Sequence, residues 1–237
     1  MTVQSKDAGT AAAKSITSLR TAARTFARFG SPRAILAGFA LALVVRAIAA
    51  VMTGWSIWDL VAVAIVVALV PFVEWFIHLL VLHSKPRSVR GITIDPGVGH
   101  REHHLEPASL NFVLLRPLEA SLFQLINAGV VVAVVGGPLW LLGVPVTGPI
   151  LTGVVMAVAG LGHYEWSHYL FHTAYRPKTR YYRRLKSNHR LHHWRNENYW
   201  LGVTTNFGDR VLRTYPAGKS AVPLSPTAKT LGIDPEN

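Results

Sequence analysis

The sequence predicts an all-α protein: an integral membrane bundle of about four transmembrane helices with a cytosolic helical cap that carries clustered histidines. Three observations predict this fold class. Half of the residues are apolar and the mean hydropathy is +0.29, above the usual range of soluble domains. The apolar residues form long runs, and basic residues fill some of the connections between these runs but not others. The histidines gather in a few short windows.

Four apolar runs supply the predicted spans, because a helix needs about 20 residues to cross the hydrocarbon core. The runs cover residues 34–52, 60–82, 118–142 and approximately 146–161. The second run exceeds the required length, so its helix is expected to leave the membrane after about Leu79. The fourth run is the shortest, and Pro145 and Pro149 stand at its start.

The basic residues predict the topology, because short connections rich in Lys and Arg stay on the cytoplasmic side. Such residues crowd the segment before the first run, the connection between the second and third, and the stretch 176–219. The connections 53–59 and 143–149 contain neither Lys nor Arg. Both termini and the histidine windows are therefore expected on the cytoplasmic side. The net charge of +12 is then explained by attraction to anionic lipid head groups. No nucleic-acid partner is expected.

The chain divides into three predicted parts. Residues 1–33 form a disordered and amphipathic N-terminal segment, for which a targeting peptide is an alternative because it is rich in Arg and Ser. Residues 34–216 form the membrane-embedded domain, and residues 217–237, which contain several prolines, form a flexible C-terminal tail. The absence of cysteine excludes disulfides, thiolate metal sites and an internal iron–sulfur cluster.

All eleven histidines fall in four short windows, which random placement does not explain. Imidazole is the commonest neutral nitrogen ligand of metals in proteins. A single histidine at a membrane interface is usually an ordinary polar residue. Eleven together without a metal would leave ring nitrogens unpaired and repel one another on protonation, so the sequence predicts a metal centre. The windows hold His78 and His83; His100, His103 and His104; His163, His168 and His172; and His189, His192 and His193.

Helical spacing suggests how these rings share two ions. Residues three or four apart lie on one helix face, which pairs His100 with His103, His168 with His172 and His189 with His192 on common ions. Adjacent histidines differ by about 100°, so one ring of each adjacent pair serves each ion. His78 and His83 differ by about 140° on an ideal helix and are expected to reach different ions.

The four windows contain motifs of a known superfamily. HLLVLH (78–83), HREHH (100–104), HYLFH (168–172) and HRLHH (189–193) resemble the histidine boxes of the membrane fatty acid hydroxylase and sterol desaturase superfamily. Residues 196–215, NENYWLGVTTNFGDRVLRTY, resemble its C-terminal signature. The resemblance implies an oxidoreductase with two iron ions and O2 as cosubstrate. Such an enzyme hydroxylates or desaturates a C–H bond in a lipid, such as a fatty acyl chain or a sterol-like molecule.

The resemblance also implies which residues hold the metal. Five imidazoles on each ion would leave one octahedral position open. No catalytic residue separate from the ligands is expected, zinc is able to occupy the site in preparations, and electrons come from an external cytochrome or a ferredoxin with its reductase. Three further residues are expected to contact the ligating histidines without binding the metal themselves: His163, Glu74 and Glu165. The implied ligands are His78, His83, His100, His103, His104, His168, His172, His189, His192 and His193.

Three alternatives remain open. A carotenoid-type hydroxylase would use the same chemistry on another lipid. A zinc-dependent membrane hydrolase fits less well, because HREHH is not HExxH and ten histidines leave little room for an activated water. A metal transporter also fits less well, because transport sites tend to lie near the midplane on broken helices. The sequence does not identify the lipid, the carbon that is oxidised or the electron donor.

Overall fold

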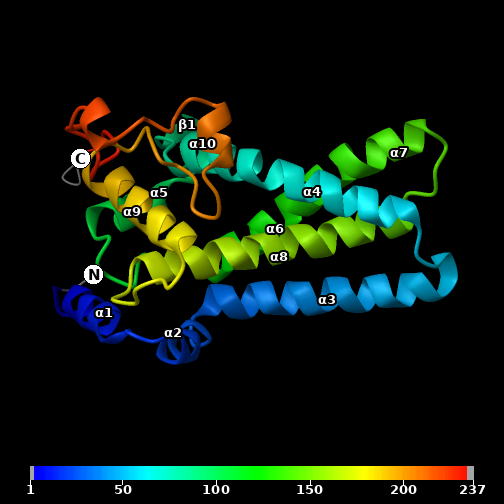
Figure 1. The fold of residues 1–237 in the computed structure, drawn as a ribbon, viewed down its shortest axis with the longest axis horizontal. Helices are drawn as coiled ribbons and strands as arrows, with labels where there is room; N and C mark the ends of the chain where they lie inside the picture. Colours follow the sequence, from blue (N-terminus) through cyan, green and yellow to red (C-terminus); the bar gives the residue numbers. More distant parts are fainter. Residues whose placement is uncertain (1–2, 234–237) are drawn as a thin grey trace. The chain divides into compact units, whose positions relative to one another are not determined.

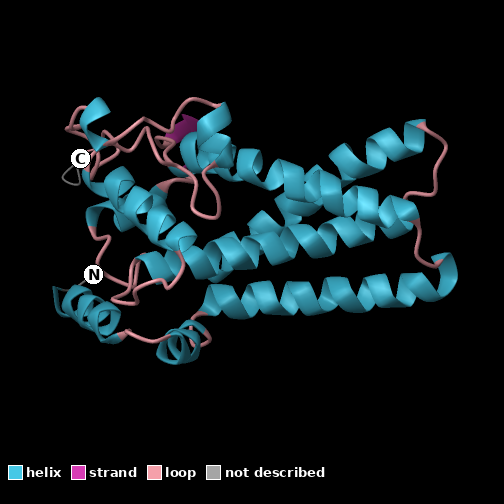
Figure 2. Ribbon diagram, viewed as in Figure 1, coloured by secondary structure: helices cyan, strands magenta, loops and turns pink. Residues whose placement is uncertain are grey.

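The chain folds mainly into helices, as the sequence predicts (Figure 2). One short β-hairpin was not predicted. The computed structural model describes residues 3–233, with side chains from residue 7 onward. The helices before the hairpin are α1 (Val3–Ser15), α2 (Leu19–Phe26), α3 (Gly30–Thr53), α4 (Ile57–Phe76) and the π-helix Ile77–Leu82. Those after it are α5 (Val98–Leu105), α6 (Pro117–Val131), the π-helix Val132–Gly136, α7 (Gly137–Leu141), α8 (Thr147–Phe171), α9 (Arg180–Trp194), α10 (Phe207–Val211) and the 3-10 helix Lys219–Ala221.

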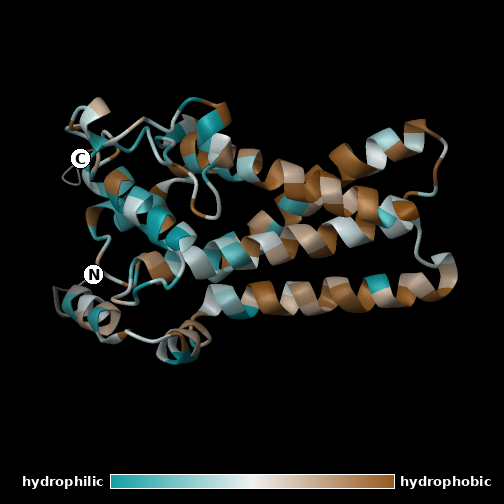
Figure 3. Cartoon of the chain, in the orientation of Figure 1, coloured by the Kyte–Doolittle hydropathy of each residue, from teal (hydrophilic) through white to brown (hydrophobic). Residues whose placement is uncertain are grey.

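Three helical segments in the described part of the chain are long and apolar enough to cross a membrane. They are Gly30–Thr53, Ile57–Leu82 and Pro117–Leu141, and they contain the first three predicted runs except Leu142. Figure 3 shows mainly apolar residues along α3. Leu36, Ile48 and Val51 on this helix are more than half exposed, as lipid-facing side chains would be. The fourth predicted run lies in α8, which is not one of these three segments.

The described residues form two compact units. One unit comprises residues 3–26, 71–114 and 166–233, and the other comprises residues 27–70 and 115–165. We call them the histidine unit and the span unit. Two of the four boundaries fall inside helices, because α4 and α8, which are labelled in Figure 1, each contribute residues to both units.

Apolar packing holds the span unit together. Ala62 and Val66 of α4 pack against Val131, Val135 and Leu139 from the third span. The approach of α8 to this core requires a small residue, because a Cβ at Gly153 would lie 2.7 Å from Val131 Cγ1. Small residues commonly allow such close contacts between membrane helices.

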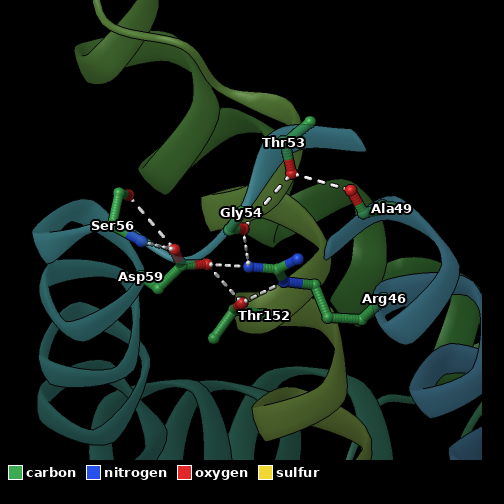
Figure 4. A network of polar contacts seen from close by, with 7 residues as sticks. All are labelled: Arg46, Ala49, Thr53, Gly54, Ser56, Asp59 and Thr152. Carbon is green, nitrogen blue, oxygen red and sulfur yellow. Dashed lines mark hydrogen bonds and ion pairs between the residues drawn. The ribbon is translucent and has the colours of Figure 1, made fainter. Parts of the chain in front are cut away.

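A buried polar network joins α3, α4 and α8 within the span unit (Figure 4). Arg46 Nη2 lies 2.9 Å from Asp59 Oδ1, and Arg46 Nε donates to Thr152 Oγ1 at 2.8 Å. Thr152 Oγ1 donates in turn to Asp59 Oδ1 at 2.6 Å, and the Ser56 backbone N–H caps the other carboxylate oxygen at 2.8 Å. The Arg46 guanidinium also lies 3.8 Å from the Trp55 ring centroid. Arg46 therefore pairs inside the bundle.

Replacing Arg46 with alanine is expected to destabilise the protein by about 3–5 kcal/mol, because it leaves Asp59 buried and unpaired. The double variant Arg46→Met with Asp59→Leu removes both charges and is expected to recover most of this loss. Thermal unfolding of the purified protein in detergent measures both. A single variant as stable as the native chain would show that water or lipid already solvates these groups.

The N-terminal segment is more ordered than the sequence suggests. Its predicted disorder is replaced by α1 and α2, and α2 buries Ala22 while exposing Arg20 and Arg24, as an amphipathic helix should. Phe26 lies with its ring centroid 5.2 Å from that of Tyr169, whose hydroxyl donates to the Ala22 carbonyl at 3.3 Å. These contacts hold the segment against the end of α8 within the histidine unit.

The C-terminal segment also differs from the predicted flexible tail over 217–237. Val222, Ala228 and Leu231 are buried. Arg195 Nε donates to the Val222 carbonyl at 2.7 Å, and the Ser225 N–H donates to the Arg195 carbonyl at 2.8 Å. The segment is therefore packed on the end of α9. Residues 234–237 of the predicted tail lie outside the described part of the chain.

A hairpin connects the first histidine window to the helix that carries the second. Strands β1 (Arg87–Val89) and β2 (Ile92–Ile94) pair antiparallel, and Arg90 and Gly91 both have positive φ in the two-residue turn. Gly97 directly precedes α5 and lies close to the end of the π-helix, because a Cβ at this position would lie only 2.7 Å from the Leu82 carbonyl oxygen. This close contact sets α5 directly against the π-helix.

Candidate metal centre

The structure brings ten histidines into two clusters. Within each cluster, one ring nitrogen of every histidine lies within 4.8 Å of the others. Both clusters belong to the histidine unit, and their rings are mostly buried. The first cluster contains His78, His83, His100, His104 and His192, and the second contains His103, His168, His172, His189 and His193.

Helix geometry explains how adjacent histidines come to serve different clusters. On α5, His103 and His104 point into separate clusters, as their 100° offset predicts. On α9, His192 and His193 divide in the same way. The four-residue pair His168 and His172 shares one cluster, as predicted.

The predicted three-residue pairs were wrong. His100 shares its cluster with His104 rather than with His103, and His189 shares its cluster with His193 rather than with His192. In both helices the spacing of four residues brings two rings to one ion position. Spacings of three and four lie almost equally close on a helix surface, so the neighbouring elements decide between them.

The prediction that His78 and His83 reach different ions was also wrong. Both belong to the first cluster. The reason is the π-helix Ile77–Leu82, in which backbone bonds join residues five apart and place them one above the other. The His83 N–H donates to the His78 carbonyl at 3.2 Å. The wide turn therefore aligns two rings that an α-helix would separate.

Backbone carbonyl groups fix the tautomers of four rings. The Nδ1 atom of each ring lies within hydrogen-bond distance of a carbonyl oxygen, so Nδ1 carries the proton and the Nε2 lone pair is free for a metal. The pairs are His78 with Leu201 at 2.6 Å, His104 with Ala228 at 2.8 Å, His172 with Pro107 at 2.7 Å and His192 with Tyr199 at 3.0 Å.

The spacing of the Nε2 atoms fits a coordinated ion. Neighbouring Nε2 atoms lie 2.8–3.2 Å apart in both clusters. Ligands at right angles, with metal–nitrogen bonds of about 2.0–2.1 Å, would lie roughly 2.9 Å apart. The pair His104 and His192 is decisive, because both carry their proton on Nδ1 and still place their Nε2 atoms 3.2 Å apart. Two lone pairs at this distance repel each other unless a cation lies between them, so the residues fit a metal.

Burial keeps these rings neutral. It lowers the pKa of His104 to about 3 and that of His172 to about 4. It also holds the pKa values of His189 and His193 well below the usual value of 6.5, and neighbouring histidines lower them further. Neutral imidazole is the form that binds metal, so the clusters are ready for ligation at neutral pH.

We expect stability and metal content to fall together as the pH drops below about 6.5. The folded-state pKa values of His104 and His172 are lowered, so between about 6.5 and the folded values of about 3 and 4 the unfolded chain binds more protons. Stability is therefore complete above about pH 6.5 and is lost toward acid, and proton competition for the ligands acts in the same direction. Thermal unfolding and retained metal, compared at about pH 5 and 7.5, test this. An unfolding temperature that rises at the lower pH would contradict it.

Glu74 supports the first cluster through the backbone rather than through a ring. Its buried carboxylate accepts hydrogen bonds from the backbone N–H groups of Val203 and Thr204 and from the Thr204 hydroxyl. Asp209, which the sequence suggested as an ion-pair partner of Arg210, instead accepts from the Leu201 N–H at 3.0 Å and the Gly202 N–H at 2.8 Å. Together they hold the segment whose carbonyl groups orient His78 and His192.

The other two expected supporting residues belong to the span unit and to neither cluster. Glu165 is buried and accepts from Ser31 Oγ at 2.9 Å and from the Leu115 N–H at 3.4 Å, so it joins the starts of α3 and α6. His163 is exposed on α8. Its role behind the ligands stays a prediction.

Comparison with known proteins identifies the family. A model of the fatty acid hydroxylase family matches residues 63–214. The chain belongs to this family. The family is one of oxidoreductases, and the matched residues include all ten clustered histidines and the segment that orients His78 and His192.

Three relatives named as 2-hydroxylases are 28–29% identical to this chain over the aligned residues. Dihydroceramide fatty acyl 2-hydroxylase FAH2 of Arabidopsis thaliana is 28% identical over 156 residues, which are 64% of this chain and 59% of the relative. Its homologue FAH1 is 29% identical over 72% of this chain and 67% of its own length. Fatty acid 2-hydroxylase of Mus musculus is 28% identical over 60% of this chain and 36% of its own length. The chain thus spans less than two thirds of FAH2.

A solved structure shares the fold. The structure titled full-length scs7p, in which only the hydroxylase domain is visible, aligns with a TM-score of 0.63 over 85% of this chain and 71% of that one. The sequence identity is 18%, so this match supports the arrangement of the chain and nothing finer.

Proposed function

We propose that this fatty acid hydroxylase inserts oxygen into a C–H bond of a membrane lipid, with two iron ions held by the ten clustered histidines. The observation that carries the proposal is the pair of five-imidazole clusters, with Nε2 lone pairs that face each other. The relatives are named for 2-hydroxylation of fatty acyl chains, so we propose carbon 2 of a fatty acyl chain as the position.

The chain's own residues prepare the site in three ways. Carbonyl groups fix the ring orientations, as at His172, whose Nδ1 lies 2.7 Å from the Pro107 carbonyl oxygen. Burial excludes water and keeps the imidazoles unprotonated. Each cluster consists of five imidazoles, so an octahedral ion held there would keep one of its six positions available. Bound iron would supply the redox chemistry that couples O2 to oxidation of the lipid.

Hydroxylation by O2 also consumes two electrons and two protons, because one oxygen atom enters the lipid and the other becomes water. The chain contains no cysteine and so holds no thiolate-bound cluster of its own. We therefore propose an external donor, either a cytochrome or a ferredoxin with its reductase.

Lipid analysis tests the proposed reaction. Cells that express the chain under isotopically heavy O2 are expected to accumulate 2-hydroxy fatty acyl lipids with one heavy oxygen in the new hydroxyl group. Cells that express the His193→Ala variant serve as the control for host enzymes. Unsaturated products without a heavy oxygen would show desaturation instead, and a hydroxyl group that carries no heavy oxygen would contradict the role of O2.

We also propose that α8 crosses the membrane as a fourth span, with both termini and the metal clusters on the cytoplasmic side. Support comes from the 53–59 and 143–149 connections, which lack Lys and Arg, and from Thr152, which ties α8 to the buried Arg46 and Asp59. Reporter fusions are expected to place Thr147 outside and the C-terminus in the cytoplasm. A cytoplasmic reporter at Thr147 would contradict the four-span topology.

A further inference from the structure

A basic cavity lies apart from the histidine clusters within the histidine unit. Its volume is about 590 Å³, enough for a small charged head group. The residues that line it come from the start of α9 and from the segment that leads into α10, and none of those in the described part of the chain is acidic. Its main lining residues are Arg180, Tyr181, Arg184, Asn206, Phe207 and Arg210.

The walls of this cavity are fixed by hydrogen bonds. The Tyr181 hydroxyl donates to the Thr204 carbonyl at 2.7 Å, and Asn188 Nδ2 donates to Asn206 Oδ1 at 2.9 Å. Both bonds join α9 to the segment before α10. Glu74 holds the same segment from α4 through the Thr204 N–H at 2.9 Å. The cavity is therefore part of the folded scaffold rather than a gap between loose loops.

The three arginines of the cavity have no carboxylate partner among the described residues. Asp209 adjoins Arg210 in sequence, but its carboxylate is buried and accepts from the Leu201 and Gly202 N–H groups. The Arg210 guanidinium lies over the Tyr215 ring, 4.6 Å from its centroid. Three uncompensated guanidinium groups around one cavity favour an anion, and planar guanidinium matches phosphate oxygens especially well.

The same cavity lies close to a membrane-spanning helix. The Phe207 ring centroid is 5.9 Å from that of Phe72, and Gly208 packs so closely on the Pro71 carbonyl oxygen that a Cβ there would clash with it. Phe72 belongs to the span Ile57–Leu82. A helix needs about 20 residues to cross the hydrocarbon core, so a crossing that starts at Ile57 would end near Phe76. Phe207 and Val211 are more than half exposed beside the arginines. The apolar side chains of Phe207 and Val211 and the arginines of the cavity therefore lie near the end of this span, where it would leave the hydrocarbon core of the membrane.

We propose that this cavity binds the phosphate head group of an anionic membrane lipid. The arginines bind the phosphate, Asn206 offers a further donor, and Phe207 contacts the upper part of an acyl chain. This site is separate from the proposed oxidation site, so lipid is bound here whether or not it is a substrate.

Native mass spectrometry of the full chain in a neutral detergent tests the proposal. With phosphatidylglycerol, we expect one lipid retained per chain, and with phosphatidylcholine we expect little. The double variant Arg184→Gln with Arg210→Gln is expected to weaken retention of phosphatidylglycerol by roughly 10- to 30-fold, since each basic group near an anionic surface contributes about fivefold. Raising the salt concentration should weaken it as well.

The matched control is Arg183→Gln with Arg190→Gln, which removes two exposed arginines of α9 outside the cavity. It should change retention by less than about twofold. If both double variants weaken retention of phosphatidylglycerol equally, the overall charge of the protein explains the binding, and the proposed site is wrong. Displacement of the lipid by inorganic phosphate at equal concentration would assign the cavity to free phosphate and overturn the lipid proposal. Because the measurement is binding, these outcomes do not depend on whether the chain hydroxylates lipid.

Discussion

His104→Ala is expected to lower metal content from two ions to about one and turnover to background. Its Nε2 lies 3.2 Å from those of both His100 and His192, so its removal opens the centre of the first cluster. Loss of a group that merely orients a ligand already costs 10–100-fold in affinity, and loss of the ligand itself should cost more than about 100-fold.

Double variants make this prediction sharper, because the clusters assign neighbouring residues to different ions. His100→Ala with His104→Ala damages only the first cluster and should still retain about one ion, whereas His103→Ala with His104→Ala damages both and should retain almost none. Elemental analysis of the purified chains distinguishes them. Equal metal content in the two double variants would show that the ten histidines do not divide into these clusters.

His163→Ala is the control for histidine replacement in general. His163 shares the polarity and the helix of His168 but belongs to neither cluster. This variant should retain about two ions and measurable turnover. If it loses metal as completely as His168→Ala does, an eleventh histidine belongs to the ligand set.

The sequence was sufficient to find eleven histidines in four short windows, and the resemblance to the histidine boxes of the superfamily separated ten of them from His163. It was not sufficient to pair them. His100 is almost equally close on the helix surface to His103 and to His104, and rings from neighbouring elements decide between them. Nothing in HLLVLH marks the π-helix that aligns His78 with His83, since a wide turn depends on packing at the end of α4.

The groups that orient the rings were hidden for a different reason. They are carbonyl oxygens, and every residue has one, so Leu201 and Pro107 carry no recognisable signal. Ala228 was missed because the prolines around it predict a loose segment, whereas that segment packs on α9 and places its carbonyl 2.8 Å from His104 Nδ1. Glu74 stood out in the sequence because an ionisable side chain in a membrane helix is energetically costly without a partner. Its partners could not be predicted, because they are backbone N–H groups more than a hundred residues away.

Glu74→Gln is expected to weaken metal binding by the first cluster by roughly 10–100-fold and to leave the second cluster filled. The carboxylate accepts from two backbone N–H groups and a hydroxyl of one short segment. An amide has a single acceptor oxygen, and its NH2 group would face donors. The segment would shift, and with it the Leu201 and Tyr199 carbonyl oxygens, which lie 2.6 Å and 3.0 Å from His78 Nδ1 and His192 Nδ1.

Chelator competition, followed by elemental analysis, measures this loss independently of turnover. Glu119→Gln is the matched control, because Glu119 caps the start of α6 by accepting from the Arg116 N–H at 2.8 Å and belongs to the span unit. It should keep both ions at native affinity. Thr204→Val, which removes one hydroxyl and keeps both backbone donors, should give a smaller loss than Glu74→Gln. If Glu74→Gln lowers the unfolding temperature while both ions stay bound at native affinity, Glu74 stabilises the fold without positioning the ligands.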